Sequence, residues 1–529
     1  MVNIDKNNKN QTEYIKKLEE TCKSQEAEIT LLKNQIAWMM EQMKLSKHKQ
    51  FGASSEKSEY DQLSFFNEAE KEVNKNLQEP TIEEIEVRYK RKKKVGKKEE
   101  NLKGLPVTVK EYFLSDEEAK CPKCFSSRHI MGKHIRKELK IVPAKVEVVE
   151  HVTHTYACRN CDKNGEQTPI SKSKAVEPVI LGSIASPSIV AYIMSQKYVN
   201  AIPLYRQEKE FERLGVDLSR QTMANWVIRC SDDWLFPIYN LMKEKLLEKD
   251  ILHADETTLQ VLKESGKPAQ SKSYMWLYRT SGSSEENIVL YEYQPDRAYK
   301  RPAQFLKGFK GYLHADGYEA YHKLPDDIII LGCFSHCRRK FDEALKSIKP
   351  AEQIGSKALQ GKNYCDKLFK IERSLVDLSP EERFKKRNEL SKPILDEFYA
   401  WLKNCNALPK SALGKAVTYA LNQWEYLNNY LLDGRTELSN NRAERSIKPF
   451  VIGRKNFLFS ATARGAKASA TIYSIVETAK ENRLNPMKYL EYLFKKMPNI
   501  DFRNDPQQLE ELLPWAKLPM ECYISGKES

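Results

Sequence analysis

The sequence predicts a multidomain α/β protein, in which a mixed β-sheet core flanked by helices follows several smaller modules. The chain has 529 residues, too many for one hydrophobic core. Residues 251–348 alternate between strand-like and helix-like segments in the order β-β-β-α-β-α-β, which is typical of a mixed sheet covered by helices. Before them stand a heptad pattern and two Cys-x2-Cys pairs, which indicate separate modules.

Composition favours a nucleic-acid partner. The formal net charge of +14 predicts binding to a polyanion, although an excess of lysine can also serve solubility alone. There is no apolar run of 18 residues and no secretory signal pattern, so we expect a soluble protein without a membrane partner. Most of the eleven cysteines stand singly, which suits a reducing compartment. We therefore expect a cytoplasmic protein.

The first module, residues 1–60, is predicted to be a coiled coil. Residues of its seam recur at alternating spacings of three and four, as a heptad requires. They are Ile15, Leu18, Cys22, Gln25, Ile29, Leu32, Ile36, Met39 and Met43. Such a seam favours a homodimer or a higher oligomer, and the polar residue Gln25 in the seam would fix the register of the paired helices. The alternative is an amphipathic helix packed on its own domain.

Residues 61–110 have the composition of a charged, flexible linker. The stretch "RYKRKKKVGKK" (88–98) contains eight lysines or arginines in eleven residues and cannot bury itself. It could contact phosphates without regard to sequence, or it could be a solvated linker and nothing more.

Residues 111–175 are predicted to hold a structural zinc ion. Two pairs, "CPKC" and "CRNC", supply four thiolates, which complete a tetrahedral site and leave no open position. The predicted ligands are Cys121, Cys124, Cys158 and Cys161. Short alternating segments between the pairs, such as "KVEVVEHVTHTYAC" (145–158), predict strands. Iron–sulfur ligation is the alternative.

Residues 176–245 are predicted to form a helical module that resembles a helix-turn-helix. Three apolar-periodic segments lie between about 186 and 230, with Pro203 opening the second, Gly215 closing it and Ser219 capping the third. The third segment carries polar residues in its first half, where the recognition helix of a helix-turn-helix faces the major groove. These candidate DNA contacts are Arg220, Gln221 and Asn225. Packing of three helices without DNA contact is the alternative.

The core, residues 246–480, contains the tetrapeptide Leu-His-Ala-Asp twice, in "ILHADETTLQVL" (251–262) and "GYLHADGYEAY" (311–321). Both copies read as strands. Strands are also predicted at 273–280 and 287–293, a helix around 298–309, and a buried strand leading into a helix at 327–348. This order is that of an RNase H-like fold, in which the first and fourth strands are neighbours. Asp255 and Asp316 should therefore lie side by side.

Two neighbouring carboxylates repel each other unless a divalent cation neutralises them. Oxygen ligands select Mg²⁺ or Mn²⁺, and phosphodiester chemistry often uses two such ions about 4 Å apart. A third carboxylate usually completes such a site. Glu444 in "NNRAERSIKPF" is a candidate, on a short helix that Pro449 should end or kink. The alternative is a capping box formed by Asn441 and Glu444.

The motifs "FGASSEK", "HADET", "GYLHADGYEAY", "NNRAERSIKPFVIGRKNFLF" and "SIVETAKENRLNP" together resemble the transposases of the IS66 family of bacterial insertion sequences. The resemblance covers nearly the whole chain. It implies a DDE transposase with an N-terminal zipper, a zinc-binding module and a small C-terminal domain (481–529). It also implies an acidic triad of Asp255, Asp316 and Glu444. Membership would further imply a bacterial, nucleoid-associated protein and small accessory proteins of the same element.

The function that this resemblance implies is binding of the terminal inverted repeats, metal-dependent cleavage of the 3′ end, and strand transfer into target DNA. Basic residues around the third carboxylate are candidates for phosphate contacts. They are Arg442, Arg445, Lys448, Arg454 and Lys455. The alternatives are an RNase H-like nuclease or resolvase that cuts without joining, and a DNA-binding protein without catalysis.

Four further expectations concern single features of the core. Glu256 follows Asp255 on a strand and should face the opposite way, outside the triad. His253 and His314 should share a face with the aspartates, where packing is a commoner role than phosphate contact. Arg483 stands where relatives have glycine, which puts a left-handed helix end in doubt. Residues 349–433 read as a helical insertion between the last strand and the helix of Glu444.

Overall fold

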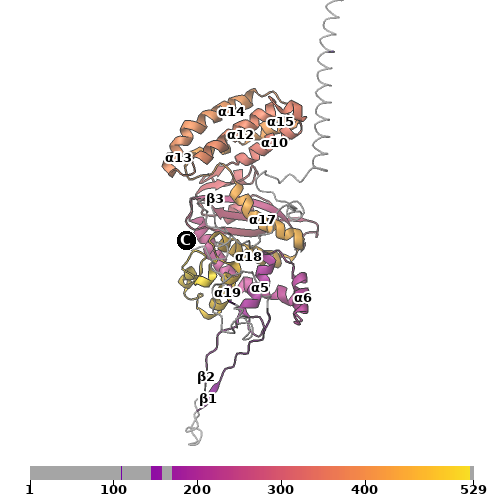
Figure 1. Ribbon diagram of the computed structural model, residues 1–529, viewed down its shortest axis with the longest axis vertical. Helices are drawn as coiled ribbons and strands as arrows, with labels where there is room; N and C mark the ends of the chain where they lie inside the picture. The colour runs from indigo at the N-terminus through magenta and orange to yellow at the C-terminus, as the bar shows by residue number, and fades with distance from the viewer. Residues whose placement is uncertain (1–24, 26–108, 110–144, 158–169, 525–529) are drawn as a thin grey trace, which may run out of the picture. The chain divides into compact units, whose positions relative to one another are not determined.

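The computed structural model describes Gln25, Val109, residues 145–157 and residues 170–524 (Figure 1). Almost all of the predicted coiled coil, the charged linker and the four cysteines of the predicted zinc site lie outside the described residues. The chain divides into two compact units. The described part of the first comprises residues 176–212 and 217–522, and the second includes residues 145–157 and 170–175.

The second unit contains a two-stranded antiparallel pair, β1 (Thr155–Ala157) and β2 (Ile170–Lys172). The predicted alternation over 145–158 forms a strand only at its end. Residues 145–154 have no regular structure, and Val148 and Val152 are 90% and 72% exposed. The prediction of a longer strand was wrong, and among the described residues no apolar layer covers the alternating valines.

Three helices follow among the described residues, as predicted: α5 (Pro187–Tyr198), α6 (Leu204–Arg213) and α7 (Arg220–Cys230). The Ser219 side chain accepts a hydrogen bond from the Thr222 N–H, which confirms the predicted N-cap of α7. Gly215 has φ = 81° in the turn between the last two helices, a conformation that glycine adopts without strain. A π-helical turn then leads into α8 (Phe236–Leu247).

A mixed sheet follows, with its strands in the predicted positions. They are β3 (Ile251–Lys263), β4 (Lys272–Thr280), β5 (Val289–Gln294), β6 (Gly311–His314) and β7 (Ile328–Leu331). The spatial order is β5-β4-β3-β6-β7. The first three pair antiparallel, whereas β3–β6 and β6–β7 are parallel. The first and fourth strands are therefore neighbours, as the sequence predicts.

The approach of β6 to β3 depends on a glycine. Gly311 begins β6 with φ = 138°, and a Cβ atom there would lie 2.3 Å from the carbonyl oxygen of Asp250. Only glycine fits so close to the neighbouring backbone. Helix α9 (Lys300–Phe305) occupies part of the predicted helical segment that precedes β6.

Helix α18 (Ala463–Glu481) packs along β5, the edge strand of the sheet. The hydroxyl groups of Ser474 and Thr478 accept hydrogen bonds from the N–H groups of Tyr291 and Val289 in β5. A short strand that the sequence did not predict, β8 (Ser460–Thr462), pairs parallel with the end of β3. It precedes α18 directly and fixes where that helix starts.

Two helices carry the remaining parts of the candidate site: α10 (Phe334–Lys346), which follows β7, and α17 (Asn441–Phe457). Of the two predicted effects of Pro449, an end or a kink, the first is wrong, because α17 continues for eight more residues after the proline. Ile447 and Phe450 are buried on either side of the proline, and this packing compensates for the lost backbone hydrogen bond.

The predicted insertion is helical throughout most of its length (Figure 1). Its helices are α11 (Pro350–Gln353), α12 (Lys357–Ser374), α13 (Pro380–Lys386), α14 (Lys392–Asn404), α15 (Ala412–Asn422) and α16 (Trp424–Asn428). Helices α12, α14, α15 and α16 pack with α10 around a separate hydrophobic core that includes Phe341, Phe398 and Trp401. Buried Arg387 joins this group by binding Glu372 and the carbonyl oxygens of Tyr430 and Thr436.

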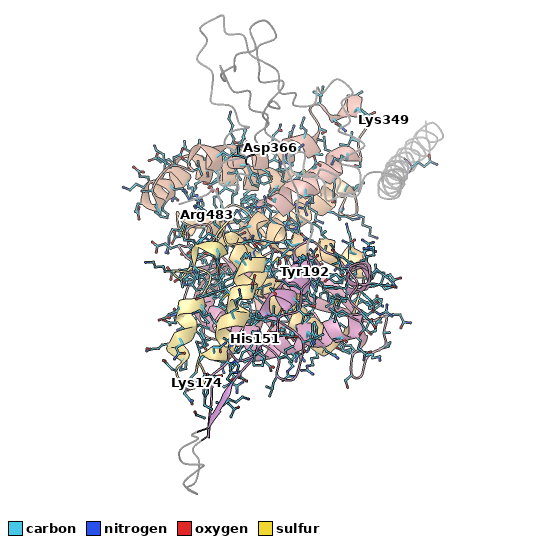
Figure 2. The ribbon with its side chains drawn as sticks, turned by 60° about the horizontal axis from the view of Figure 1, so that its bottom comes forward. His151, Lys174, Tyr192, Lys349, Asp366 and Arg483 are labelled. Carbon is cyan, nitrogen blue, oxygen red and sulfur yellow. The ribbon has the colours of Figure 1, made fainter. Side chains whose placement is uncertain are left out.

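The chain ends with α19 (Pro486–Lys496) and three short 3₁₀ turns. Before it, Arg483 (labelled in Figure 2) has φ = 61°, and the Leu484 N–H donates to the Ala479 carbonyl. The left-handed end of α18 is therefore present without glycine, so the doubt raised by Arg483 was unfounded. No helix among the described residues is long and apolar enough to cross a membrane.

Candidate active site

The two aspartates of the repeated tetrapeptide follow paired strand positions. His253 of β3 pairs with His314 of β6 in the parallel register, and each aspartate stands two residues further on. Asp255 is still within β3, whereas Asp316 follows the end of β6. The Oδ1 atom of each accepts a backbone N–H, from Glu256 at 2.8 Å and from Tyr318 at 3.0 Å. Both carboxylates are thus held by backbone rather than by flexible side chains.

The pKa of Asp255 lies well above its ordinary value. Burial raises it most, and the charges of Glu256, Asp316 and Glu444 raise it further, against the opposing Glu256 N–H. The charges of Asp316 and Glu444, the other two predicted carboxylates, therefore act on Asp255. A cation would relieve this repulsion, which is the condition that a metal site of this kind requires.

Glu444 lies in the first turn of α17 and faces α10. Its Oε2 accepts a hydrogen bond from Arg339 at 3.2 Å, and its Oε1 lies 3.7 Å from His336 Nδ1. The N-cap of the helix is Asn440, and its side chain makes no capping hydrogen bond. The capping-box alternative was wrong, because the first helical residue is Asn441 and the glutamate turns toward another helix.

Asn440 ties the start of α17 to the strand of Asp255. Its side-chain Nδ2 donates to the Ala254 carbonyl at 2.7 Å, and its Oδ1 lies 2.9 Å from His253 Nδ1. Its backbone N–H donates to the Cys333 sulfur at 3.2 Å. One buried residue thus joins β3, the start of α17 and Cys333, which precedes α10. It thereby fixes where the helix that carries Glu444 begins.

The histidines of the two tetrapeptides stack on each other, with ring centroids 4.3 Å apart and 14° between planes. Both are fully buried, so neither can contact a phosphate in this structure. His314 Nε2 accepts the Glu437 N–H at 3.0 Å. Burial lowers the pKa of His253 to about 4, and it lowers the pKa of His314 well below its usual value. They are neutral packing residues that position the segment before α17.

Glu256 has other partners than the triad. Its carboxylate accepts hydrogen bonds from Arg297 and, at 2.6 Å, from the Tyr321 hydroxyl. Its side chain is only 1% exposed. Burial raises the pKa of Glu256, the nearby Asp316 charge adds to this, and Tyr321 and Arg297 oppose it. Arg297 Nη2 also lies 3.9 Å from Asp316 Oδ2, so this arginine bridges the two acidic residues.

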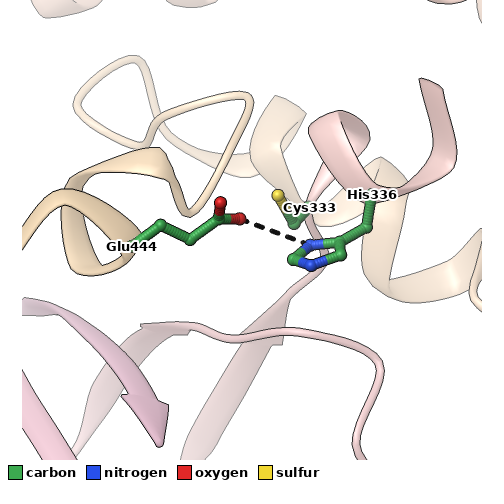
Figure 3. Close-up of side chains that lie close together, drawn as sticks. All are labelled: Cys333, His336 and Glu444. Carbon is green, nitrogen blue, oxygen red and sulfur yellow. Dashed lines mark ion pairs between the residues drawn. The ribbon is translucent and has the colours of Figure 1, made fainter. Parts of the chain in front are cut away.

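Residues of α10 complete the surroundings of Glu444, and the sequence reasoning missed them. Cys333, His336 and Glu444 bring their ligand atoms within 4.8 Å of one another (Figure 3). Burial acts to lower the pKa of His336, but Cys333 and Glu444 raise it to about 9. The available signal was the Cys-x2-His spacing in "GCFSHCRRKF", directly after a buried strand.

The five basic residues predicted around Glu444 fall into two groups. Arg442 is bound to Glu437, and Arg454 donates to Thr257 and Thr258 of β3. The other three side chains are exposed on or near the same helix: Arg445, Lys448 and Lys455. The predicted contacts of α7 are also exposed at its start: Arg220, Gln221 and Asn225.

The comparisons agree with this arrangement. Residues 182–468 match the family described as "Transposase IS66 family". Residues 118–162 match the "zinc-finger binding domain of transposase IS66", residues 474–515 the "IS66 C-terminal element", and residues 38–109 the "Transposase C of IS166 homeodomain". The zinc-finger match includes all four cysteines of the predicted ribbon.

Three proteins of Sinorhizobium fredii (strain NBRC 101917 / NGR234) are similar over most of their length. Uncharacterized protein y4hP is 29% identical over 75% of this chain and 73% of its own. Uncharacterized protein y4jD is 29% identical over 78% of this chain and 82% of its own. Uncharacterized protein y4qI is 30% identical over 74% of this chain and 72% of its own. The protein is thus of the DNA transposase class. The chain belongs to the IS66 transposase family.

Proposed function

We propose that this protein cleaves the 3′ ends of an insertion sequence and joins them to target DNA, using Asp255, Asp316 and Glu444. The observation that carries the proposal is the parallel pairing of β3 with β6, which brings the two tetrapeptides together. Asn440 supports the third member by linking the start of α17 to β3. The strand order β5-β4-β3-β6-β7 also supports an RNase H-like core.

The donor set fits a divalent cation. Three carboxylates offer the oxygen ligands that Mg²⁺ and Mn²⁺ prefer, and the pKa of Asp255 is raised first by burial and then by the neighbouring carboxylate charges. Among the described residues, these three do not form a group with all ligand atoms within 4.8 Å. Two ions, one between the aspartates and one near Glu444, fit this spread better than one. Such a pair would activate the attacking oxygen and stabilise the leaving oxygen.

The chain's own residues would orient the carboxylates and the DNA. The Glu256 and Tyr318 N–H groups each hold one oxygen of an aspartate, and Arg297 lies 3.9 Å from the other oxygen of Asp316. Arg339 holds one oxygen of Glu444. Exposed Arg445, Lys448 and Lys455 would contact phosphates, which position the duplex without reading its sequence.

End recognition is assigned to the N-terminal modules. We propose that the four cysteines hold zinc in a ribbon (111–175) and that a helix-turn-helix-like module (176–245) reads the ends. The coiled coil (1–60) would pair two copies, so that each copy can hold one end. Small accessory proteins would be partners supplied by the same element.

The test uses purified protein, Mg²⁺, a linear duplex carrying the element's end, and a target plasmid. We expect nicks at the 3′ end followed by joined products on a denaturing gel. Cleavage without joining, including from pre-cut ends, would favour a nuclease or resolvase. Binding without cleavage in Mg²⁺ or Mn²⁺ would favour a DNA-binding protein that has lost catalysis. Either result contradicts the proposal.

A further inference from the structure

Three side chains of different chemistry converge beside the candidate active site. Cys333 is the N-cap residue of α10, His336 lies in the first turn of the same helix, and Glu444 lies in the first turn of α17. Their ligand atoms all lie within 4.8 Å of one another, and the side chains point toward one another (Figure 3). Two helix starts thus present a sulfur, a nitrogen and an oxygen to one point.

Two of these atoms are buried without a hydrogen-bond partner. They are His336 Nδ1 and Glu444 Oε1, and each has the other as its polar neighbour at 3.7 Å. This separation is too long for a hydrogen bond, and burying a polar atom without a partner is unfavourable. Two ligands bound at about 2.1 Å to a tetrahedral ion are about 3.4 Å apart. The spacing therefore suits an ion between them better than direct contact.

The surrounding contacts orient the ligand atoms toward this point. Arg339 binds Glu444 Oε2 and leaves Oε1 facing His336. The Asn440 N–H donates to the Cys333 sulfur at 3.2 Å and so holds this sulfur in place. Such outer contacts fix the ligands of metal sites in proteins.

We propose that Cys333, His336 and Glu444 form a binding site for a first-row transition metal ion of the Zn²⁺ type. A thiolate and an imidazole select such ions over Mg²⁺, which prefers oxygen ligands alone. Three protein ligands leave the fourth tetrahedral position open, as in zinc sites that bind a water or a substrate atom. The site is separate from the four cysteines of residues 121–161.

The inference deepens the proposed function and rests on it at one point, since Glu444 belongs to both. The charge of Glu444 raises the pKa of Asp255, so the cluster and the aspartate pair are electrostatically coupled. The two ion positions of the active site would then differ in chemistry. One has only carboxylate oxygens from Asp255 and Asp316, and the other adds sulfur and nitrogen from α10.

The test measures zinc bound to the full-length chain, dialysed after zinc loading, by elemental analysis. We expect Cys333→Ser and His336→Ala each to bind one zinc ion fewer per chain than the wild type. Co²⁺ loading gives a second readout, because the loss of one thiolate ligand removes part of the sulfur-to-cobalt absorption. Far-ultraviolet circular dichroism checks folding, and if Cys333→Ser unfolds, His336→Ala carries the comparison.

The matched control is Cys405→Ser, which removes a partly buried thiol outside the cluster and should bind as much zinc as the wild type. Equal zinc content in the wild type and both cluster variants would overturn the inference. Asp255→Asn separates this inference from the proposed function, because it should retain the ion yet lose cleavage. Cleavage by Asp255→Asn would refute the proposed function and leave the zinc result untouched.

Discussion

The two halves of the candidate site are positioned by different means. Asp255 and Asp316 come from neighbouring parallel strands, and backbone hydrogen bonds of the ladder and of adjacent N–H groups set their places. Glu444 comes from a helix, and side chains of distant segments set its place. The strand half depends on local sequence pattern, whereas the helix half depends on contacts between residues more than a hundred positions apart.

This difference teaches where each half is vulnerable. A backbone ladder tolerates changes of its side chains, because the N–H and carbonyl groups remain. A side-chain network fails when one member is lost, because the partners are left buried and unsatisfied. The stacked histidines and Asn440 link the two halves. His253 and His314 belong to the strands; His253 contacts Asn440 at the start of α17, and His314 accepts the N–H of Glu437 just before it.

The largest expected effect is on DNA cleavage, when the carboxylate charge of either half of the site is removed. Asp316→Asn and Glu444→Gln should each lower DNA cleavage by about 10³-fold or more, because several kcal/mol of transition-state stabilisation depend on bound cations. Gel-shift affinity for end DNA should stay within about threefold, since the phosphate-contacting residues are unchanged. A variant that cleaves within tenfold of the wild type does not belong to the triad.

Next in size is the loss of the link between the halves. Asn440→Leu should lower the free energy of unfolding by about 2–4 kcal/mol, because it leaves the Ala254 carbonyl and His253 Nδ1 without partners. Cleavage should fall as well, since Glu444 loses its anchor. Urea denaturation and cleavage rates measure the two effects. Asn441→Ala, one residue along, is the control, and an equal loss in both variants would contradict the assigned role.

The stacked histidines predict a pH dependence of stability. The unfolded His253 has a pKa near 6.5 and the folded one about 4, so between these values only the unfolded state binds the proton. Stability should therefore fall as the pH falls, by about 1.4 kcal/mol per unit for this residue. His253→Asn keeps a donor for Asn440 and removes the titration.

Between pH 6.5 and pH 5, urea denaturation should show the wild type losing about 2 kcal/mol more than His253→Asn. Asp255 titrates in both proteins, so its contribution cancels in the difference. The same loss in both proteins would mean that His253 does not stay neutral in the fold.

The smallest expected effect lies outside both halves. Arg483 holds a left-handed conformation at the end of α18, which costs a residue with a Cβ atom about 1 kcal/mol. Arg483→Gly should raise the free energy of unfolding by about that amount and leave cleavage unchanged. Arg483→Ala keeps the Cβ atom and should gain nothing. A gain in both variants would assign the effect to the lost charge instead.

The strand half could be predicted from the sequence because its signals are local. Alternating apolar residues define β3 and β6, and the order of elements makes them neighbours. The cluster of Cys333 and His336 around Glu444 could not be predicted, because it requires two helix starts to meet in space. Pro449 misled the reading of α17 for the same reason: buried packing, invisible in the local pattern, carries that helix past the proline.

The roles of His253 and His314 were decided only by the structure. Spacing placed them on the face of the aspartates, but it could not show that the two rings stack on each other and are fully buried. Strand β8 was missed because three residues carry too little periodicity to be recognised. The zinc ribbon and the coiled coil rest on sequence pattern and family matches alone.

The central claim is that residues from two strands and one helix form one DNA-joining centre. The most direct measurement is strand transfer from pre-cut ends by Asp255→Asn, beside Asp327→Asn, which removes an exposed carboxylate that precedes β7 and pairs with Lys310. The account predicts that Asp255→Asn binds the ends yet yields no joined product, while Asp327→Asn joins at the wild-type rate. Joining by Asp255→Asn at a rate near that of the wild type would contradict it.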